Sequence, residues 1–294
     1  MRKCLKNSKL RTIGKILLSV ISVNIITLSS CILGSLIYQN IHITNFADML
    51  SNTMNSDLGY ALCIIITTIL VYLFYKYITK KEKMNWEDLG FSKKHRFSQL
   101  INGFLLGIIF VAIYIFILIV MKQVSFEFKR LDANILYSLF MGAIIFCGVA
   151  FAEEITYRGY IQNLLSKKSK YIGLIITAVI FALSHLLNSS YSLLSLIYLT
   201  IGGILLGLMR METKNIWFPL GFHIAWNWTE IRIFGLGNDM NSHWFSTNII
   251  QNTIWNGGES GTGIIIVLVE LALIVLFAYL YLRKNQNKTD NYSA

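Results

Sequence analysis

The chain has 294 residues, of which 55% are hydrophobic and only 14% are charged. A soluble domain of this length needs more polar side chains than that to cover its surface. Apolar runs of about 20 residues recur along the chain, and a run of that length can cross the hydrocarbon core of a bilayer as a helix. The composition therefore excludes a soluble globular protein and predicts an integral membrane protein.

The predicted fold class is all-α, a polytopic transmembrane helical bundle of about eight spans. In chain order, the expected spans cover residues 16–37, 59–75, 101–121, 135–165, 171–187, 193–209, 216–231 and 263–282. We divide the chain into three regions on this basis. Residues 1–98 hold two spans and a basic cytosolic loop, residues 99–232 form a core, and residues 233–294 hold an external loop, the last span and a cytosolic tail.

The formal net charge of +11 is distributed unevenly between the two sides of the expected membrane. If both termini are cytosolic, the cytosolic segments hold 21 of the 26 Lys and Arg residues, and the external loops hold three. An excess of basic residues in the cytosolic segments is the rule for multi-pass membrane proteins. The charge therefore predicts a multi-pass protein of the cell membrane with cytosolic termini and contacts to anionic lipid, and gives no indication of nucleic-acid binding.

The fourth expected span contains two adjacent carboxylates and an arginine, Glu153, Glu154 and Arg158. An ionisable side chain at the centre of a membrane helix costs roughly 2.5–3.5 kcal/mol, so such residues are usually functional. Glu154 and Arg158 are four residues apart and share a helix face, which predicts that Arg158 neutralises and holds Glu154. Glu153 points about 100° away and is therefore the candidate general base.

The fifth and seventh expected spans contribute His185, and His223 with Asn227. His223 and Asn227 are again four residues apart and present their polar ends on one helix face. At a rise of 1.5 Å per residue, the polar residues of the three spans lie about 10–21 Å from the cytosolic ends of their helices. Each residue alone is more simply explained by helix packing. Together they form a set that can meet near one depth and activate a water molecule.

The three motifs read Glu153-Glu154-x-x-x-Arg158, Phe181-x-x-x-His185 and His223-x-x-x-Asn227. In this order they resemble the defining pattern of the CPBP family of intramembrane proteases, which includes the CAAX prenyl endopeptidases and bacterial homologues implicated in bacteriocin immunity. The resemblance covers roughly residues 100–230, the core region, and shows no departure at the defining positions.

The resemblance implies an enzyme, an intramembrane endopeptidase acting on a membrane protein or peptide. It implies that Glu153 and His185 activate the water, that His223 and Asn227 stabilise the oxyanion, and that Arg158 holds Glu154 in place as a supporting pair. The family has been described both as glutamic proteases and as metalloproteases. The sequence lacks His-Glu-x-x-His, so the usual helical zinc site is absent. If the enzyme depends on a metal, Glu153, His185 and His223 are the zinc ligands that we expect.

Two other classes of protein remain open at this point. One is a non-catalytic membrane protein with an immunity or regulatory role, and the other is a small proton-coupled transporter that uses the same carboxylates. The intact set of polar residues favours the enzyme, and the absence of visible internal repeats disfavours the transporter. Glu270 and Arg232 lie outside the motifs, and we expect them to pair across helices in a structural role.

Overall fold

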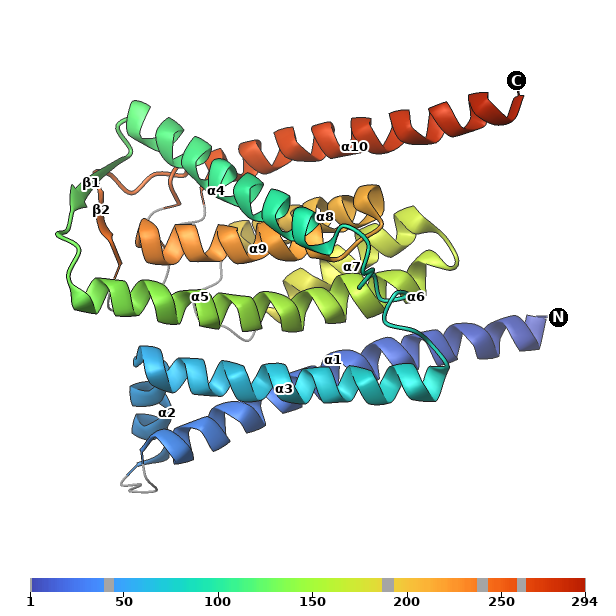
Figure 1. The fold of residues 1–294 in the computed structure, drawn as a ribbon, viewed down its shortest axis with the longest axis horizontal. Helices are drawn as coiled ribbons and strands as arrows, with labels where there is room; N and C mark the ends of the chain where they lie inside the picture. The colour runs from blue at the N-terminus through green and yellow to red at the C-terminus, as the bar shows by residue number, and fades with distance from the viewer. Residues whose placement is uncertain (1, 40–44, 187–192, 237–242, 258–262, 294) are drawn as a thin grey trace.

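The structure is a computed structural model that describes residues 2–39, 45–186, 193–236, 243–257 and 263–293. It is an almost entirely helical bundle with one small sheet (Figure 1). The elements in chain order are α1 (Arg2–Tyr38), α2 (Phe46–Met54), α3 (Asp57–Glu82), α4 (Arg96–Val120), β1 (Val124–Phe128), α5 (Ala133–Glu154), the π-helix η1 (Ile155–Ile161), α6 (Gln162–Ser166), α7 (Lys170–Ser184), α8 (Leu193–Thr213), α9 (Trp217–Trp228), the π-helix η2 (Thr229–Ile233), β2 (Phe245–Ile249) and α10 (Ile264–Ser293).

The predicted all-α membrane bundle is confirmed, but the expected number of spans is too high. Within the described residues, six helical segments are long and apolar enough to cross a membrane. They are 10–38, 57–82, 96–120, 133–166, 193–213 and 264–284. Of the other two expected spans, α7 has 15 residues, and α9 has 12 residues and continues directly as η2 to Ile233. At 1.5 Å per residue α7 is only about 23 Å long, which is short of a hydrocarbon core of about 30 Å. The apolar run around α7 therefore overstated the length of the helix that it forms.

The side chains on the outside of the bundle are those of a protein that faces lipid. Large apolar residues are exposed along the long helices, among them Ile25 on α1, Leu105 and Phe116 on α4, and Val275 on α10. Hydrocarbon, unlike water, accepts such a surface without cost, and helices satisfy their backbone hydrogen bonds internally. The protein is thus an integral membrane protein by its surface as well as by its helix lengths.

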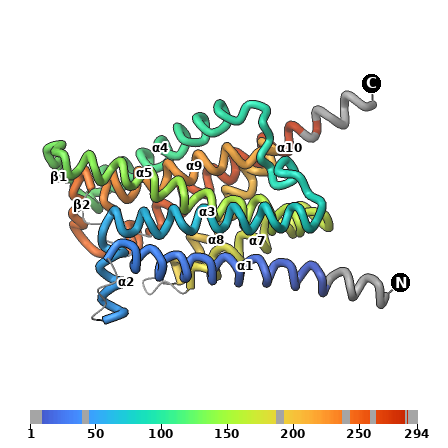
Figure 2. The backbone as a smooth tube through the Cα atoms, turned by 60° about the horizontal axis from the view of Figure 1, so that its bottom comes forward, coloured from blue at the N-terminus to red at the C-terminus, as the bar shows by residue number. Residues whose placement is uncertain are grey.

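Five helices lie side by side in the order α1, α3, α5, α9 and α4 (Figures 1 and 2). α7 and α8 pack against each other, and α8 also packs against α10. The N-terminus of α1 and the C-terminus of α10 lie at the same end of the bundle, opposite the β-strands (Figure 1). An even number of membrane crossings gives this arrangement.

The contact between α4 and α9 depends on glycines. A Cβ atom at Gly103 would collide with the carbonyl of Phe218, and one at Gly221 would collide with the carbonyl of Leu100. Small residues of this kind let two helix backbones approach closely within a membrane. The close approach fixes the position of α9, which carries His223 and Asn227.

At the end opposite the termini, β1 and β2 form a two-stranded antiparallel sheet. Val124 pairs with Ile249 and Phe128 with Phe245. The sequence predicts only loop between residues 233 and 262, so β2 (Phe245–Ile249) was missed. A strand that depends on a partner 121 residues earlier in the chain has little local signal in a Gly- and Asn-rich segment.

The expected pairing of Arg232 with Glu270 is wrong. The guanidinium of Arg232 donates instead to Asp57 at 2.5 Å and to Ser138 at 2.7 Å. Glu270 is fully buried on α10, and neither of its carboxylate oxygens has a hydrogen-bond partner among the residues that the structure describes. Arg232 therefore ties η2, which continues α9, to α3 and α5.

Candidate active site

The site begins where α5 changes from an α-helix to a π-helix. Glu154 is the last residue of α5, and the π-helix η1 follows it from Ile155 to Ile161. Single turns of π-helix are rare and occur mostly at functional sites. The Nη1 atom of Arg158 donates to Oε1 of Glu154 at 2.9 Å, and both side chains are 1% exposed. The structure thus contains the ion pair that the four-residue spacing predicts.

Arg158 has two further contacts that hold it in place. Its Nη2 atom donates to the backbone carbonyl of Gly203 on α8 at 3.4 Å. Its guanidinium lies over the ring of Phe181, with Cζ 4.4 Å from the ring centroid. A cation over an aromatic face is attracted to the ring in a desolvated setting. Arg158 therefore connects η1 with α7 and α8 as well as with Glu154.

Glu154 has a second partner that the sequence does not reveal. The same Oε1 atom lies 3.0 Å from Nδ1 of His223 on α9. A carboxylate that already accepts from Arg158 can only accept from the imidazole, so the hydrogen is on Nδ1 of His223. Glu154 consequently orients the ring of His223, and the Nε2 atom of that ring points to Glu153.

His185, the C-cap residue of α7, is oriented by its own helix. Its Nδ1 atom lies 2.8 Å from the carbonyl oxygen of Phe181. A carbonyl oxygen cannot donate, so Nδ1 of His185 carries the hydrogen and Nε2 is the outward nitrogen. The hydroxyl of Tyr157 donates to Ser184 at 2.7 Å, and Ser184 donates to the same carbonyl at 2.6 Å. Tyr157 and Ser184 were not singled out in the sequence, because neither belongs to the three motifs.

Glu153 lies between the two histidines. Its Oε1 atom is 3.7 Å from Nε2 of His185, and its Oε2 atom is 3.6 Å from Nε2 of His223. The three groups come from α5, α7 and α9 and were predicted to meet near one depth. These distances are longer than a hydrogen bond. In the neutral tautomers, Nε2 of each histidine accepts hydrogen bonds, as the Glu153 carboxylate does. A hydrogen-bond donor such as water is therefore the partner that suits the space between these three groups.

The ionisable side chains of the cluster differ in their exposure, which divides them into an accessible group and an enclosed group. Glu153 is 24% exposed and His185 is 17% exposed, whereas His223 is 6% exposed. Glu154 and Arg158 are enclosed. Only a group that retains some exposure can meet a substrate. Glu153 and His185 therefore form the accessible part of the cluster, and the Glu154–Arg158 pair lies behind it.

Asn227 lies one turn after His223 on α9 and is half-buried. Its side chain makes no hydrogen bond to any residue that the structure describes. The structure thus brings Glu153, Glu154, Arg158, His185 and His223 into direct contact and leaves the amide of Asn227 available beside them.

The cluster can be tested for metal binding by its donor atoms. Two imidazole nitrogens and a carboxylate are ligands that zinc accepts, and each histidine donates its other N–H to an oxygen, as zinc-binding histidines do. In the described part of the chain, however, no group of three His, Cys, Asp or Glu side chains is arranged to hold a metal ion. The chemistry below is derived from the side chains themselves, and Glu153, His185 and His223 are the residues that would hold a zinc ion if the reaction uses one.

The fold and the site together define a class of protein, an integral membrane protein with a cluster of carboxylates and imidazoles between its helices. Residues 135–229 match the model of one family, described as "Type II CAAX prenyl endopeptidase Rce1-like". This segment spans α5 to the start of η2 and includes all three motifs. The match supports the resemblance to the CPBP/CAAX protease family that the three motifs predict. Comparisons with curated proteins and with solved structures give no match.

Proposed function

We propose that the protein is an intramembrane endopeptidase in which Glu153 is the general base. The family supports a membrane-embedded endopeptidase of the CAAX type. The observation that carries the finer proposal is the position of Glu153, which lies within 3.7 Å of Nε2 of both His185 and His223.

Glu153 and His185 share the activation of water in this proposal. A water bound between them donates one hydrogen to the carboxylate and one to Nε2 of His185. As its oxygen attacks the peptide carbonyl, one of these two groups takes the proton and later returns it to the leaving amine. General acid–base catalysis of this kind contributes typically 10²–10⁴-fold to the rate. The carbonyl of Phe181 holds the ring of His185 in the tautomer that this step requires.

His223 and Asn227 lie on one face of α9 and are the proposed donors to the oxyanion. Asn227 supplies its amide N–H, and His223 can donate from Nε2 when the ring carries a second proton. A donor fixed in position before the reaction is worth about 10²–10³-fold in rate. The enclosed pair of Glu154 and Arg158 acts indirectly, because Glu154 holds Nδ1 of His223 at 3.0 Å.

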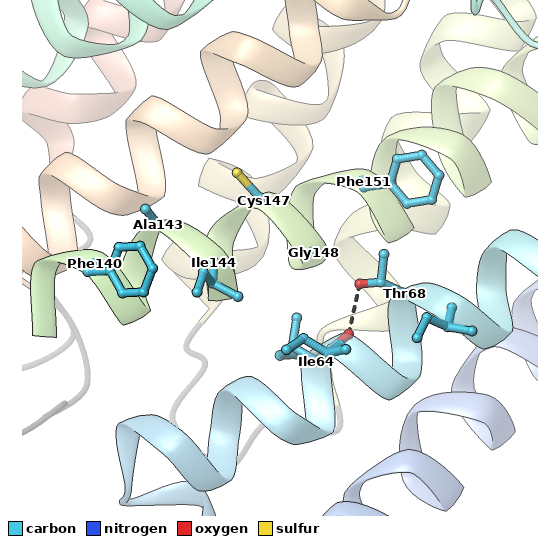
Figure 3. A pocket seen from close by; sticks show the side chains of 10 residues that line it. Ile64, Thr68, Phe140, Ala143, Ile144, Cys147, Gly148 and Phe151 are labelled. Atoms are coloured by element: carbon cyan, nitrogen blue, oxygen red, sulfur yellow. Dashed lines mark hydrogen bonds between the residues drawn. The ribbon is translucent and has the colours of Figure 1, made fainter. Parts of the chain in front are cut away.

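An apolar groove on the bundle suits a substrate that carries hydrocarbon. It lies between α3 and α5, has a volume of about 550 Å³, and is lined by residues that include Ile64, Phe140, Cys147 and Phe151 (Figure 3). The hydroxyl of Thr68, also in the lining, is satisfied by the carbonyl of Ile64 on its own helix. Phe151 is two residues before Glu153 on α5. The groove therefore supports a lipid-modified or strongly apolar membrane peptide as substrate, such as a prenylated CAAX-like protein or a bacteriocin or pheromone precursor.

We further propose that the end of the bundle with both termini faces the cytosol. The connection between α6 and α7 and the start of α4 lie at this end (Figure 1), and they carry Lys167, Lys168 and Arg96. The opposite end holds the three basic residues between α4 and α5, Lys122, Lys129 and Arg130. Positive residues favour the cytosolic side of a membrane.

The proposed function is tested by comparing the membrane proteomes of cells that carry the wild-type protein and the Glu153→Gln variant. We expect at least one peptide whose cleavage disappears in the variant, while the variant protein is present at the wild-type level. Identical proteomes at equal protein levels would contradict the enzyme. They would favour a non-catalytic immunity or regulatory protein, or a transporter, with the same fold.

A further inference from the structure

Arg210 lies in the last turn of α8, outside the cluster around Glu153, and its guanidinium rests on a glycine. A Cβ atom built on Gly90 would lie 2.6 Å from both Cζ and Nε of Arg210 and 2.7 Å from Nη2. These three guanidinium atoms lie at nearly equal distances from the Cβ position, so the flat face of the guanidinium is turned towards Gly90. The guanidinium is therefore stacked flat on the backbone of Gly90, which has a φ of +93°. No residue with a side chain fits there.

The stacking uses the flat face of the guanidinium. Its N–H bonds lie in the plane of the group, so none of them is used by this contact. An arginine has five N–H donors. Arg210 makes no hydrogen bond or ion pair within the part of the chain that the structure describes, and its Nε is enclosed without a partner. None of the acidic residues of the adjoining segments pairs with Arg210 in the described part of the chain. Glu212 pairs with Lys284 through Oε1 at 2.9 Å, Asp88 accepts from the backbone N–H of Asn85 at 2.6 Å, and Glu87 is exposed. A half-buried cation without a counter-ion is a site that favours an anion.

The depth of Arg210 in the membrane follows from the aromatic residues beside it. Phe91 contacts both Trp86 and Trp217, with ring centroids 5.4 and 5.3 Å apart. The indole N–H of Trp217 donates to the carbonyl of Ser92 at 3.0 Å. Tryptophans collect at the level of the lipid headgroups, where the ring is in an apolar layer and its N–H is satisfied. Gly90 is joined to this layer, because its carbonyl accepts from the N–H of Ile216 at 2.9 Å.

The surface around this position is basic. Lys93, Lys94 and Arg96 are exposed just after Gly90, and Lys214 is exposed just after α8. The backbone carbonyl of Lys94 accepts from the side chain of Asn215 at 3.4 Å, which places this basic segment against the loop between α8 and α9. Basic pockets between membrane helices at the headgroup level are typical binding sites of anionic lipids.

We propose that Arg210 binds the phosphate of an anionic phospholipid headgroup on the surface formed by residues 84–94 and the end of α8. The planar guanidinium offers two parallel N–H donors to two phosphate oxygens, and the lysines nearby add attraction that depends on salt. The bound headgroup fastens the segment around Gly90 to α8 and to the start of α9. This site is separate from the proposed peptidase chemistry, and its test requires no substrate.

The test uses the full-length protein purified in detergent and measures its melting temperature during titration with lipid. We compare phosphatidylglycerol, phosphatidylcholine and inorganic phosphate, for wild type and for Arg210→Gln, Arg210→Lys and Arg283→Gln. Arg283 is an exposed arginine at the same end of the bundle and serves as the matched control. A ligand that binds only the folded state raises the melting temperature with its concentration.

We expect phosphatidylglycerol to raise the melting temperature of the wild-type protein and of Arg283→Gln by several degrees more than phosphatidylcholine does. Arg210→Gln should lose this difference, with a fall in apparent affinity of about 10- to 100-fold, as for the loss of a hydrogen bond between charged groups. Arg210→Lys keeps the charge without the planar fork and should lie between the two. If Arg210→Gln fails to fold, the comparison of wild type with Arg210→Lys tests the proposal instead.

Three results would overturn the proposal. The first is equal stabilisation of wild type and Arg210→Gln, or of wild type and Arg210→Lys, by phosphatidylglycerol. The second is an equal loss in Arg210→Gln and Arg283→Gln, which would show diffuse surface charge. The third is an equal shift with inorganic phosphate alone, which would show a site for a free anion and not for a lipid.

Discussion

Replacing Glu154 by glutamine should destabilise the protein more than any other single change in the cluster. Arg158 is 1% exposed, and its bond to Glu154 at 2.9 Å is its only ion pair within the described residues. Its remaining contacts are the carbonyl of Gly203 at 3.4 Å and the ring of Phe181. Neither carries a negative charge. Stranding a buried charge in this way typically costs about 3–5 kcal/mol. For a large domain each kcal/mol lowers the melting temperature by about 2–4 °C, so we expect a fall of at least ~6 °C.

The reasoning is tested with a double-mutant cycle that combines Glu154→Gln with Arg158→Met, with melting temperature in detergent as the readout. The double variant should recover much of the stability that Glu154→Gln loses, because no unpaired charge remains. It should not recover cleavage activity, because Nδ1 of His223 still lacks its carboxylate partner. Additive losses of stability would refute the pairing and, with it, the reason for treating Glu153 as the separate base.

Four further predictions concern the chemistry, metal content, topology and core. Glu153→Gln should abolish measurable cleavage, and Asn227→Ala should reduce it by about 10²–10³-fold. Both variants should keep the wild-type melting temperature. A folded Glu153→Gln variant with wild-type turnover would rule out Glu153 as the base. The purified enzyme should contain zinc well below one equivalent and keep its activity in 1,10-phenanthroline, whereas one equivalent of zinc lost together with activity would identify a metalloprotease. Alkaline phosphatase fused to the C-terminus should be inactive, since that enzyme requires export, and an active fusion would reverse the proposed orientation. Glu270→Gln should leave the melting temperature unchanged or raise it, because a buried carboxyl with no hydrogen-bond partner among the described residues adds no stabilising contact and the amide has nearly the same shape. A loss of several degrees would show that the carboxyl makes a stabilising contact.

The sequence predicts the parts of the cluster that depend on local spacing. Glu154 and Arg158 are four residues apart on one helix, and that spacing alone brings them together. The contact of Glu154 with His223 joins residues 69 positions apart, and the contact of Arg232 with Asp57 joins residues 175 apart. Helical periodicity carries no information on which helices become neighbours. For the same reason, the partner of Arg232 was predicted from its charge alone and was wrong.

The length of α7 explains how the polar cluster around Glu153 can form within a membrane bundle. His185 is the C-cap residue of α7, so this helix ends where the polar cluster begins. The backbone N–H of His185 bonds to the carbonyl of Ala182, and the carbonyl of Phe181 accepts from the side chains of His185 and Ser184. A helix that continued through the membrane would hold this carbonyl in its own ladder, and His185 would lose the acceptor that fixes its tautomer. The shortfall of α7 relative to the predicted span is therefore part of what positions Nε2 of His185 against Glu153.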